Sequence, residues 1–333
     1  MSNTGKDLYK LHADNLDGLT VFQEPWWLDA VTAGSWDVVV LETNGKMEAA
    51  LPYAYKTILG RRLICQPALT QHTGPWVKEN SKSSASKRLA REHRLLGKLF
   101  DDLPPYWHLS MAWASPRGNW LPLFWRGFSQ TTYYTYRLTD LSCTDRIFEN
   151  MDYRVRRQIN KARERESLTV SVSSDGEFEG LYELHKVVYL RQGRKPPHAR
   201  EFLLQLDRAC RERDRRRIFT ARDREGRCHA AAYIVRDRDC AYYLYSGSDP
   251  DLRQSGALSL CLWSAIQYFS KDTRFFDFEG SMVPSIERHF RGFGAEQVPY
   301  FRISRSNSII ASLVERLRSQ RNLRRRMAAS PGT

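Results

Sequence analysis

Two acidic residues stand at the predicted end of a strand, in the segment Phe276-Asp277-Phe278-Glu279-Gly280. Alternation along a strand would turn Asp277 and Glu279 to the same face of a sheet. Such a pair can raise the pKa of one carboxyl through the charge of the other, which suits a general base near neutral pH. The segment therefore predicts proton abstraction from an attacking group. The alternative is structural, with Glu279 capping the next turn and Asp277 supporting a basic neighbour.

Hydroxyl donors lie in a second segment, Tyr242-Tyr243-Leu244-Tyr245-Ser246-Gly247. A tyrosine hydroxyl can donate a hydrogen bond to a developing oxyanion or act as a general acid. Tyr243 and Tyr245 are candidates for these roles. Ordinary sheet packing is the alternative, because aromatic residues are common in strands.

A candidate phosphate site precedes the predicted helix of residues 257–269. The free N–H groups and dipole of a helix N-terminus attract phosphate, and an arginine beside them adds a positive charge. The residues that would form this site are Arg253, Ser255, Gly256 and Ala257.

Two further groups of side chains are candidates for binding substrate. Gln71, His72 and Trp76 lie in a loop with two prolines and a glycine, and His72 could serve as a base, although a lone loop histidine is often incidental. Tyr189 and Arg191 end a predicted helix, where cations suit the dipole and could also clamp an anionic substrate.

Composition limits the class of protein. The chain has 333 residues, which suffices for two domains, and a formal net charge of +14 that favours phosphate-rich or anionic partners. Its basic residues gather in three runs, 154–165, 208–217 and 316–326, which could bind nucleic acid or phosphate or could be solvated helix faces. A basic amphipathic helix is predicted over 308–326, which could pack on the second domain or lie on anionic lipid or RNA.

Cysteine usage and the lack of apolar stretches indicate the compartment. The six cysteines are far apart and form no C-x-x-C pair, so neither a metal site nor a disulfide framework is predicted. No segment has the ~18 apolar residues of a membrane-spanning helix, and the N-terminus lacks an apolar signal region. We expect a cytoplasmic protein.

A long internal repeat predicts a duplicated fold. The turns at Asn44-Gly45 and Gly226 each join two alternating runs into a hairpin, and Trp125-Arg126-Gly127-Phe128 is repeated as Phe290-Arg291-Gly292-Phe293 before an aromatic strand. His289 and Arg291 are weaker site candidates, because the repetition of Arg126 suggests a structural role. The predicted parts are a first domain (1–144), a second domain (145–306) and a basic C-terminal helix with a tail (307–333).

Hydrophobic periodicity and turn residues place the elements. The first half is predicted to hold helices at 22–31, 84–100 and 121–125 and strands at 36–41, 47–55, 62–65, 107–113 and 133–138. The second half is predicted to begin with one helix over 145–166, whose apolar stripe is Val155, Ile159 and Ala162. It continues with strand 168–172, helices 178–190 and 200–213, strands 218–222, 229–235 and 240–245, helix 257–269, strand 274–278, a short helix and a last strand.

This succession resembles the GNAT acyltransferase fold, and two such domains in tandem resemble the Fem-type peptidyltransferases. Residues 153–162 are similar to the basic R-x-x-I-x-K-A helix of that group, and residues 276–281 and 290–295 are similar to its D-F-x-G and F-x-x-F-G motifs. The resemblance implies an α/β (α+β) chain of duplicated GNAT domains, with mixed, mostly antiparallel sheets flanked by helices. Residues 253–257 fall one residue short of the Q/R-x-x-G-x-G/A loop that holds coenzyme A in conventional members.

The resemblance also implies an activity. It predicts transfer of an aminoacyl or acyl group to an amine acceptor bound in a cleft between the domains, with aminoacyl-tRNA or acyl-CoA as donor and no tightly bound cofactor. An acetyl-CoA-dependent N-acetyltransferase is one alternative, and a non-catalytic scaffold that binds RNA or an anionic surface is another. The expected partners are tRNA, an amine-bearing small molecule, peptide or cell-wall precursor, and an anionic membrane surface, but not DNA.

Overall fold

A computed structural model describes residues 5–80, 83–113, 119–191, 193–280 and 282–307. Contacts divide the chain into two compact units, one of Met1–Tyr133 with Pro299–Thr333 and the other of Tyr134–Val298. The predicted helix at 308–326, and with it the third basic run, lies outside the described residues.

The sheet of unit 1 follows the order β1-β2-β3-β5-β12. Its strands are β1 (Trp36–Thr43), β2 (Lys46–Ile58), β3 (Arg61–Cys65), β5 (His108–Trp113) and the distal part of β12 (Glu296–Ser306), and the short β4 (Trp76–Val77) pairs with β2. Only the pair β3 and β5 is parallel among these neighbours. Asn44 and Gly45 have φ values of 52° and 70°, so the predicted turn between β1 and β2 is confirmed.

Four helices accompany this sheet: α1 (Gly5–His12), α2 (Pro25–Thr32), α3 (Ala85–Asp101) and α4 (Leu121–Phe124). The hydroxyl of Ser84 accepts a hydrogen bond from the backbone N–H of Lys87 and so caps α3. Leu96 and Leu99 of α3 are fully buried against the sheet residues Leu51 and Leu109. The sequence analysis did not predict α1.

The sheet of unit 2 follows the order β6-β11-β10-β9-β8-β7. Its strands are the distal part of β6 (Ser129–Leu138), β7 (Thr169–Ser173), β8 (Arg216–Arg222), β9 (Cys228–Arg236), β10 (Cys240–Ser248) and β11 (Phe275–Asp277). The pair β10 and β11 is parallel, and the other neighbours for which register is known are antiparallel.

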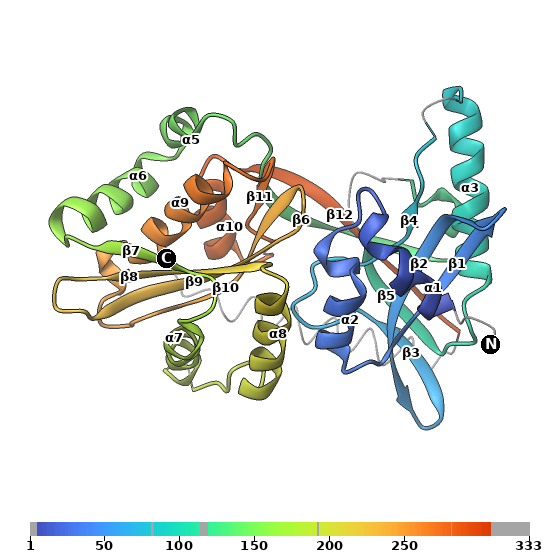
Figure 1. Cartoon of the computed structure of the whole chain (residues 1–333), viewed down its shortest axis with the longest axis horizontal. Helices are drawn as coiled ribbons and strands as arrows, with labels where there is room; N and C mark the ends of the chain where they lie inside the picture. The colour runs from blue at the N-terminus through green and yellow to red at the C-terminus, as the bar shows by residue number, and fades with distance from the viewer. Residues whose placement is uncertain (1–4, 81–82, 114–118, 192, 281, 308–333) are drawn as a thin grey trace. The chain divides into compact units, whose positions relative to one another are not determined.

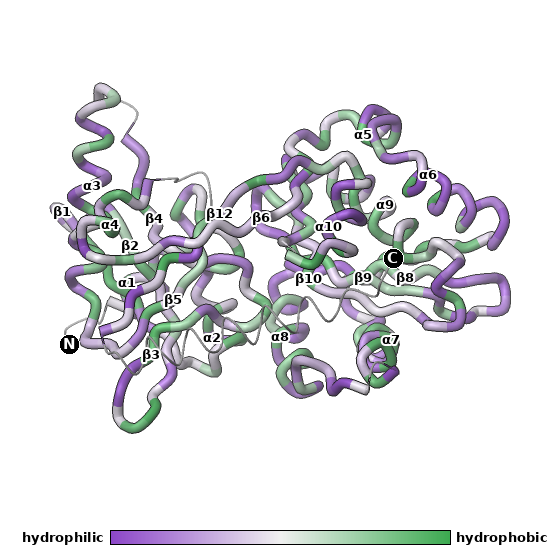
Figure 2. Tube along the Cα trace, turned by 180° about the vertical axis from the view of Figure 1, so that it is seen from behind, coloured by the Kyte–Doolittle hydropathy of each residue, from purple (hydrophilic) through white to green (hydrophobic). Residues whose placement is uncertain are grey.

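Helices cover both faces of this second sheet (Figure 1). On one face lie α9 (Ala257–Phe269), α6 (Tyr153–Asn160) and α10 (Pro284–Arg291), and on the other lie α7 (Phe178–Leu190) and α8 (Arg200–Glu212). The hydrophobic α9 packs into the core, whereas its neighbour α6 is mostly hydrophilic (Figure 2).

Both units repeat one sequence of pairings, which supports the predicted duplication. Two antiparallel hairpins are followed by a helix, a strand parallel to the third strand of the hairpins, a short helix and a final strand. The final strands are exchanged: β6 follows α4 of unit 1 but pairs with β11 of unit 2, whereas β12 follows α10 of unit 2 but pairs with β5 of unit 1. The predicted contiguous ranges 1–144 and 145–306 do not describe this exchange.

The predicted single helix over 145–166 is wrong. The chain forms α5 (Thr144–Asn150), then α6, then a π-helical turn at Lys161–Arg165. Met151 is extended between α5 and α6, and the backbone N–H of Asp152 donates to the carbonyl of Gly292 at 2.8 Å, outside any helix. The predicted stripe of Val155, Ile159 and Ala162 is buried, as expected. A tertiary hydrogen bond therefore replaces the helical one at the break.

No helix within the described ranges is both long enough and apolar enough to span a membrane.

Candidate functional site

The candidate site in unit 2 lies where β10 and β11 part. Their register runs from Cys240 opposite Phe275 to Tyr242 opposite Asp277, where β11 ends, and β10 continues to Ser248. Beyond Tyr242, β10 is therefore not paired with β11. An unpaired strand edge offers backbone N–H groups that can bind a substrate carbonyl.

A bulge in β10 turns its two candidate tyrosines to opposite faces. Tyr243 lies opposite Ile234 of β9, and Tyr245 lies opposite the adjacent Tyr233, so that Leu244 is the extra residue. In a regular strand, Tyr243 and Tyr245 would share a face.

Tyr245 lies on the face covered by α7 and contributes to packing. It is buried, and its ring stacks on Tyr233 with centroids 4.9 Å apart. Burial raises its pKa well above the ordinary value of a tyrosine. The structure therefore turns Tyr245 away from Tyr243 and gives it a core environment, in which its ring lies 5.2 Å from that of His185 of α7.

Tyr243 is the more accessible of the two tyrosines. It is half-buried, packs edge-on against Phe290 of α10, and shares a hydrogen bond with the Ser246 hydroxyl. Burial raises its pKa to about 12, with Glu279 contributing in the same direction. Tyr243 is thus a neutral hydroxyl at physiological pH, able to donate a hydrogen bond.

The structure assigns different environments to the two predicted carboxylates. Asp277 is fully buried and forms an ion pair with Arg137 of β6 at 2.8 Å. It also accepts hydrogen bonds from the Thr135 hydroxyl and from the backbone N–H of Glu279, the latter at 2.8 Å. Burial alone would lower the pKa of Arg137, but Asp277 raises it above its ordinary value. These contacts fit the structural alternative for Asp277, that of supporting a basic neighbour.

Glu279 differs from Asp277 in its backbone conformation and in its hydrogen bonding. It follows the end of β11 with φ of 57°, so strand alternation does not govern its direction. Its Oε1 atom is buried without a hydrogen-bond partner among the described residues. Burial first, and the nearby Asp277 charge second, raise its pKa well above the ordinary value. Glu279 is therefore the candidate general base.

His185 of α7 is a candidate that the sequence analysis missed. Its Nδ1 atom lies 2.8 Å from the Ser246 carbonyl, which can only accept, so Nδ1 carries the proton. Its Nε2 atom is buried without a partner in the part of the chain that the structure describes. Burial lowers its pKa, which keeps the ring neutral. No local motif marks this histidine, because it reaches Ser246 only through the packing of α7 on β10.

Tyr189 and Arg191 occupy different environments at the end of α7. The Tyr189 ring lies 5.0 Å from that of His185, and an electrostatic interaction links Tyr189 with Tyr243. Arg191 is exposed and pairs with the exposed Asp251 at 3.4 Å. The structure thus brings Tyr189 to the candidate site with Tyr243, Glu279 and His185, whereas Arg191 lies at the surface.

The predicted phosphate loop is covered by helix α6. A Cβ atom at Gly256, which has φ of 81°, would clash with the Gln158 carbonyl. The Ser259 hydroxyl donates to the Gln158 side chain at 2.7 Å, and the Lys161 ammonium donates to the Gln254 carbonyl at 2.7 Å. The close packing of α6 therefore explains why position 256 is a glycine.

The four predicted phosphate ligands accordingly differ in access. Ser255 and Ala257 are buried, and the Ala257 N–H faces the Ser255 hydroxyl at 3.4 Å. Arg253 is exposed, and its side chain has no hydrogen bond or ion pair within the described ranges.

The loop of Gln71, His72 and Trp76, which was predicted to bind substrate, is buried in the core of unit 1. Gln71, His72 and Trp76 are 9%, 3% and 6% exposed. The Trp76 indole donates to the Asp17 carbonyl at 2.9 Å, and the His72 ring packs edge-on against Phe22. The side chains of Trp76 and His72 therefore make structural contacts within unit 1.

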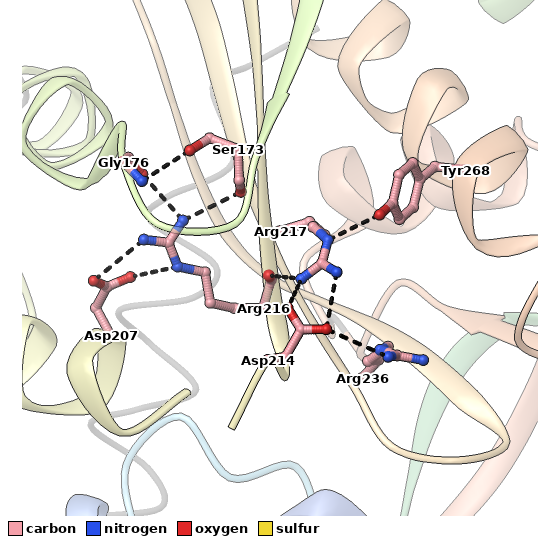
Figure 3. Close-up of polar contacts among 8 residues, drawn as sticks. All are labelled: Ser173, Gly176, Asp207, Asp214, Arg216, Arg217, Arg236 and Tyr268. Carbon is pink, nitrogen blue, oxygen red and sulfur yellow. Dashed lines mark hydrogen bonds and ion pairs between the residues drawn. The ribbon is translucent and has the colours of Figure 1, made fainter. Parts of the chain in front are cut away.

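The last two arginines of the second basic run form ion pairs and hydrogen bonds within unit 2 (Figure 3). Arg216 is 1% exposed and lies 3.1 Å from the Asp207 carboxylate, and it also donates to the Ser173 carbonyl at 3.2 Å. Arg217 pairs with Asp214 at 2.6 Å. Within the described residues, no three side chains of His, Cys, Asp or Glu lie close enough together to hold a metal ion.

Comparison with known proteins supports the fold. Residues 149–282 match the family model of the acetyltransferase (GNAT) domain. No curated protein sequence matches the chain. The crystal structure of FemX is similar, with 12% identity, a TM-score of 0.65, and coverage of 89% of this chain and 95% of FemX.

Two other structures are similar over most of their length. L-PGS from Bacillus licheniformis is 13% identical with a TM-score of 0.54, covering 98% of this chain and 99% of that one. The C-terminal domain of a provisionally named lysylphosphatidylglycerol synthetase from Agrobacterium fabrum is 14% identical with a TM-score of 0.52, covering 87% and 93%. At such identities the likeness shows the fold alone. The chain is thus a protein of tandem-GNAT, Fem-like fold, in which residues 149–282 form the matched GNAT domain.

Proposed function

We propose that this protein is an acyltransferase that transfers an aminoacyl or acyl group to an amine, with Glu279 as general base. The observation that carries the proposal is the buried, unpartnered Oε1 atom of Glu279 beside the unpaired edge of β10. A carboxyl group with a raised pKa accepts a proton from an attacking ammonium more readily than an ordinary surface glutamate does.

The proposed reaction needs only groups that unit 2 places near one another. The acceptor nitrogen attacks the carbonyl carbon of the donor, and Glu279 takes the proton that the nitrogen loses. Backbone N–H groups at the bulge of β10 and the Tyr243 hydroxyl are candidate donors to the oxyanion. When the carbon–oxygen or carbon–sulfur bond to the leaving group breaks, the proton on Glu279 returns to the alcohol or thiol.

An aminoacyl ester is the donor that we favour over acyl-CoA. Helix α6 covers the loop at Gly256 that would hold the pyrophosphate of coenzyme A. The name lysylphosphatidylglycerol synthetase, borne by one structural neighbour, denotes an enzyme whose product carries a lysyl group, which agrees with an aminoacyl donor. The exposed face of α6 would then contact tRNA.

Mass spectrometry of the purified protein with charged tRNAs, acyl-CoAs and a set of amines tests the reaction. We expect consumption of an aminoacyl ester and formation of an amide, with Glu279→Gln slowing turnover by about 10²–10⁴-fold. Glu149→Gln, a change on the exposed surface of α5, is the matched control. Full turnover by Glu279→Gln would show that Glu279 is not the base.

Charge reversal on α6 and on the π-helical turn that follows it tests the choice of donor. Arg157 of α6 and Arg165 of the π-helical turn are exposed, and neither side chain has a hydrogen bond or ion pair to described residues. If each contacts one phosphate, Arg157→Glu with Arg165→Glu should weaken tRNA binding and lower the salt slope, d log K/d log [salt], by about 2 in magnitude. Calorimetric binding of coenzyme A, without tRNA binding by the parent protein, would identify an acyl-CoA donor. Binding of tRNA without any turnover would favour the RNA-binding scaffold.

A further inference from the structure

Helices α6 and α10 line a hollow of about 550 Å³ that is partly open to solvent. Both helices lie on the face of the unit 2 sheet that carries α9 (Figure 1). The two helices are fixed relative to each other at one end of the hollow. The Asp152 N–H donates to the Gly292 carbonyl at 2.8 Å, and Gly292 packs so closely on Val155 that a Cβ atom would lie 2.8 Å from its Cγ2. A volume of this size suits a small-molecule ligand.

The charges that line the hollow do not cancel. Arg291 pairs with Glu287 at 2.8 Å and also interacts with Asp152. Arg154 and Arg288 line the same hollow, are exposed, and have no ion pair or hydrogen bond of the side chain within the described ranges. Two uncompensated guanidinium groups, one from each helix, therefore face one concave space.

A histidine adds a buried polar atom to this wall. His289 lines the hollow, and its Nε2 atom is buried with no hydrogen-bond partner among described residues. Its ring packs edge-on against Phe293 at 5.4 Å, which fixes its position. A buried polar atom without a partner is costly, and a ligand oxygen could satisfy it.

We propose that this hollow is a binding site for the phosphate group of a small ligand, held by Arg154 and Arg288 with His289 as a third contact. Guanidinium groups bind phosphate through paired, charge-assisted hydrogen bonds, which favours phosphate over a carboxylate of lower charge. Tyr153, 69% exposed, also lines the hollow and offers a ring face for a base or sugar. A nucleoside monophosphate or sugar phosphate would have suitable chemistry.

Titration with inorganic phosphate, followed by ³¹P NMR, tests the site without reference to any acyl transfer. We expect saturable binding by the parent protein and at least about tenfold weaker binding by Arg154→Gln with Arg288→Gln. Arg146→Gln is the matched control, because Arg146 is exposed on the preceding helix α5 and does not line the hollow. Equal affinity in the double variant and the control, or no saturable binding by the parent protein, would overturn the proposal.

A second titration tests the role of Tyr153. Adenosine monophosphate should bind the parent protein more tightly than inorganic phosphate does, and Tyr153→Ala should remove that gain while leaving the affinity for inorganic phosphate within about twofold. Thermal unfolding of each variant confirms that the fold is intact. If Tyr153→Ala weakens both ligands equally, the aromatic part of the proposal is wrong. Because binding alone is measured, failure of the proposed acyl transfer would leave these results unaffected.

Discussion

The two units share an Arg-Gly-Phe turn at the ends of their short helices but use its arginine differently. In unit 1, Arg126 reaches Asp101 of α3 through two hydrogen bonds of 2.7 and 2.8 Å. In unit 2, Arg291 pairs with Glu287, one turn earlier on its own helix α10. The phenylalanine of each turn is buried in its core. The buried phenylalanine is thus common to both units, whereas the arginine has different roles. Arg126 connects the turn to α3 in unit 1, and Arg291 lines the hollow between α6 and α10 in unit 2.

The C-terminal ends of the corresponding strands β5 and β11 also differ between the two units. Strand β5 of unit 1 ends at Trp113, whose ring stacks on Phe100 at 6.2 Å. Strand β11 of unit 2 ends at Asp277, with Glu279 two residues beyond. Unit 1 therefore closes its strand end with aromatic packing, whereas unit 2 places a buried ion pair and a carboxyl group of raised pKa there. The comparison assigns the proposed chemistry to unit 2.

The largest effect on stability should come from breaking the ion pair at the end of β11. Asp277→Asn leaves the Arg137 guanidinium without its carboxylate, and we expect it to lower the free energy of unfolding by about 3–5 kcal/mol. Urea unfolding followed by circular dichroism measures the change. Asp101→Asn, which removes the exposed partner of Arg126 in unit 1, should cost no more than about 1 kcal/mol. Similar losses for both would contradict the distinction between the two units.

The regular elements could be predicted because their signal is local. Helices α7 and α9 begin and end at the residues that periodicity predicts, Phe178–Leu190 and Ala257–Phe269. The positive φ of Asn44 and Gly45 likewise follows from residue type alone. Each of these features depends on contacts within a few residues of the chain.

The features that shape the candidate site depend on distant contacts and could not be predicted. The bulge at Leu244 exists only in the register with β9, and the burial of Asp277 depends on Arg137, which is 140 positions away. His185 reaches the site through packing of α7 on β10. Sequence reasoning therefore found the strand ends that carry Asp277 and Glu279 but could not distinguish the roles of the two carboxylates.

The glycines of the repeated turn offer the next test of the comparison. Gly292 has a helical φ of −61°, but a Cβ atom would lie 2.8 Å from Val155 Cγ2, so Gly292→Ala should destabilise unit 2 by about 1–3 kcal/mol through overpacking. Val155→Ala in the same chain should recover part of this loss. Thermal and urea unfolding of the single and double variants measure the coupling.

Gly127 provides the matched substitution in unit 1, with a different physical cause. Its φ is 75°, and no atom lies within 4 Å of the Cβ position, so Gly127→Ala should cost about 1 kcal/mol through backbone strain alone. No neighbouring truncation should rescue it. If removing a neighbouring side chain restored Gly127→Ala, the two glycines would share a packing role, contrary to the comparison.

The remaining prediction is a pH-dependent gain in stability from Glu279→Gln. Because the folded-state pKa of Glu279 is raised, the folded protein retains a proton that the unfolded chain releases as pH rises above about 4.5. The parent protein therefore loses stability over that interval, whereas glutamine does not titrate. Each unit of pKa difference corresponds to about 1.4 kcal/mol, so the advantage of Glu279→Gln should grow between about pH 4.5 and neutrality.

Urea unfolding at several pH values, with Glu149→Gln as an exposed control, measures this difference. The free energy of unfolding of Glu279→Gln, minus that of the parent protein, should increase with pH. The same difference for the control variant should not change with pH. A difference that is constant from acid to neutral pH would mean that Glu279 keeps an ordinary pKa in the folded state. Glu279 would then lack the proton affinity that the proposed general base requires, and the contrast between the strand ends of β5 and β11 would be one of packing alone.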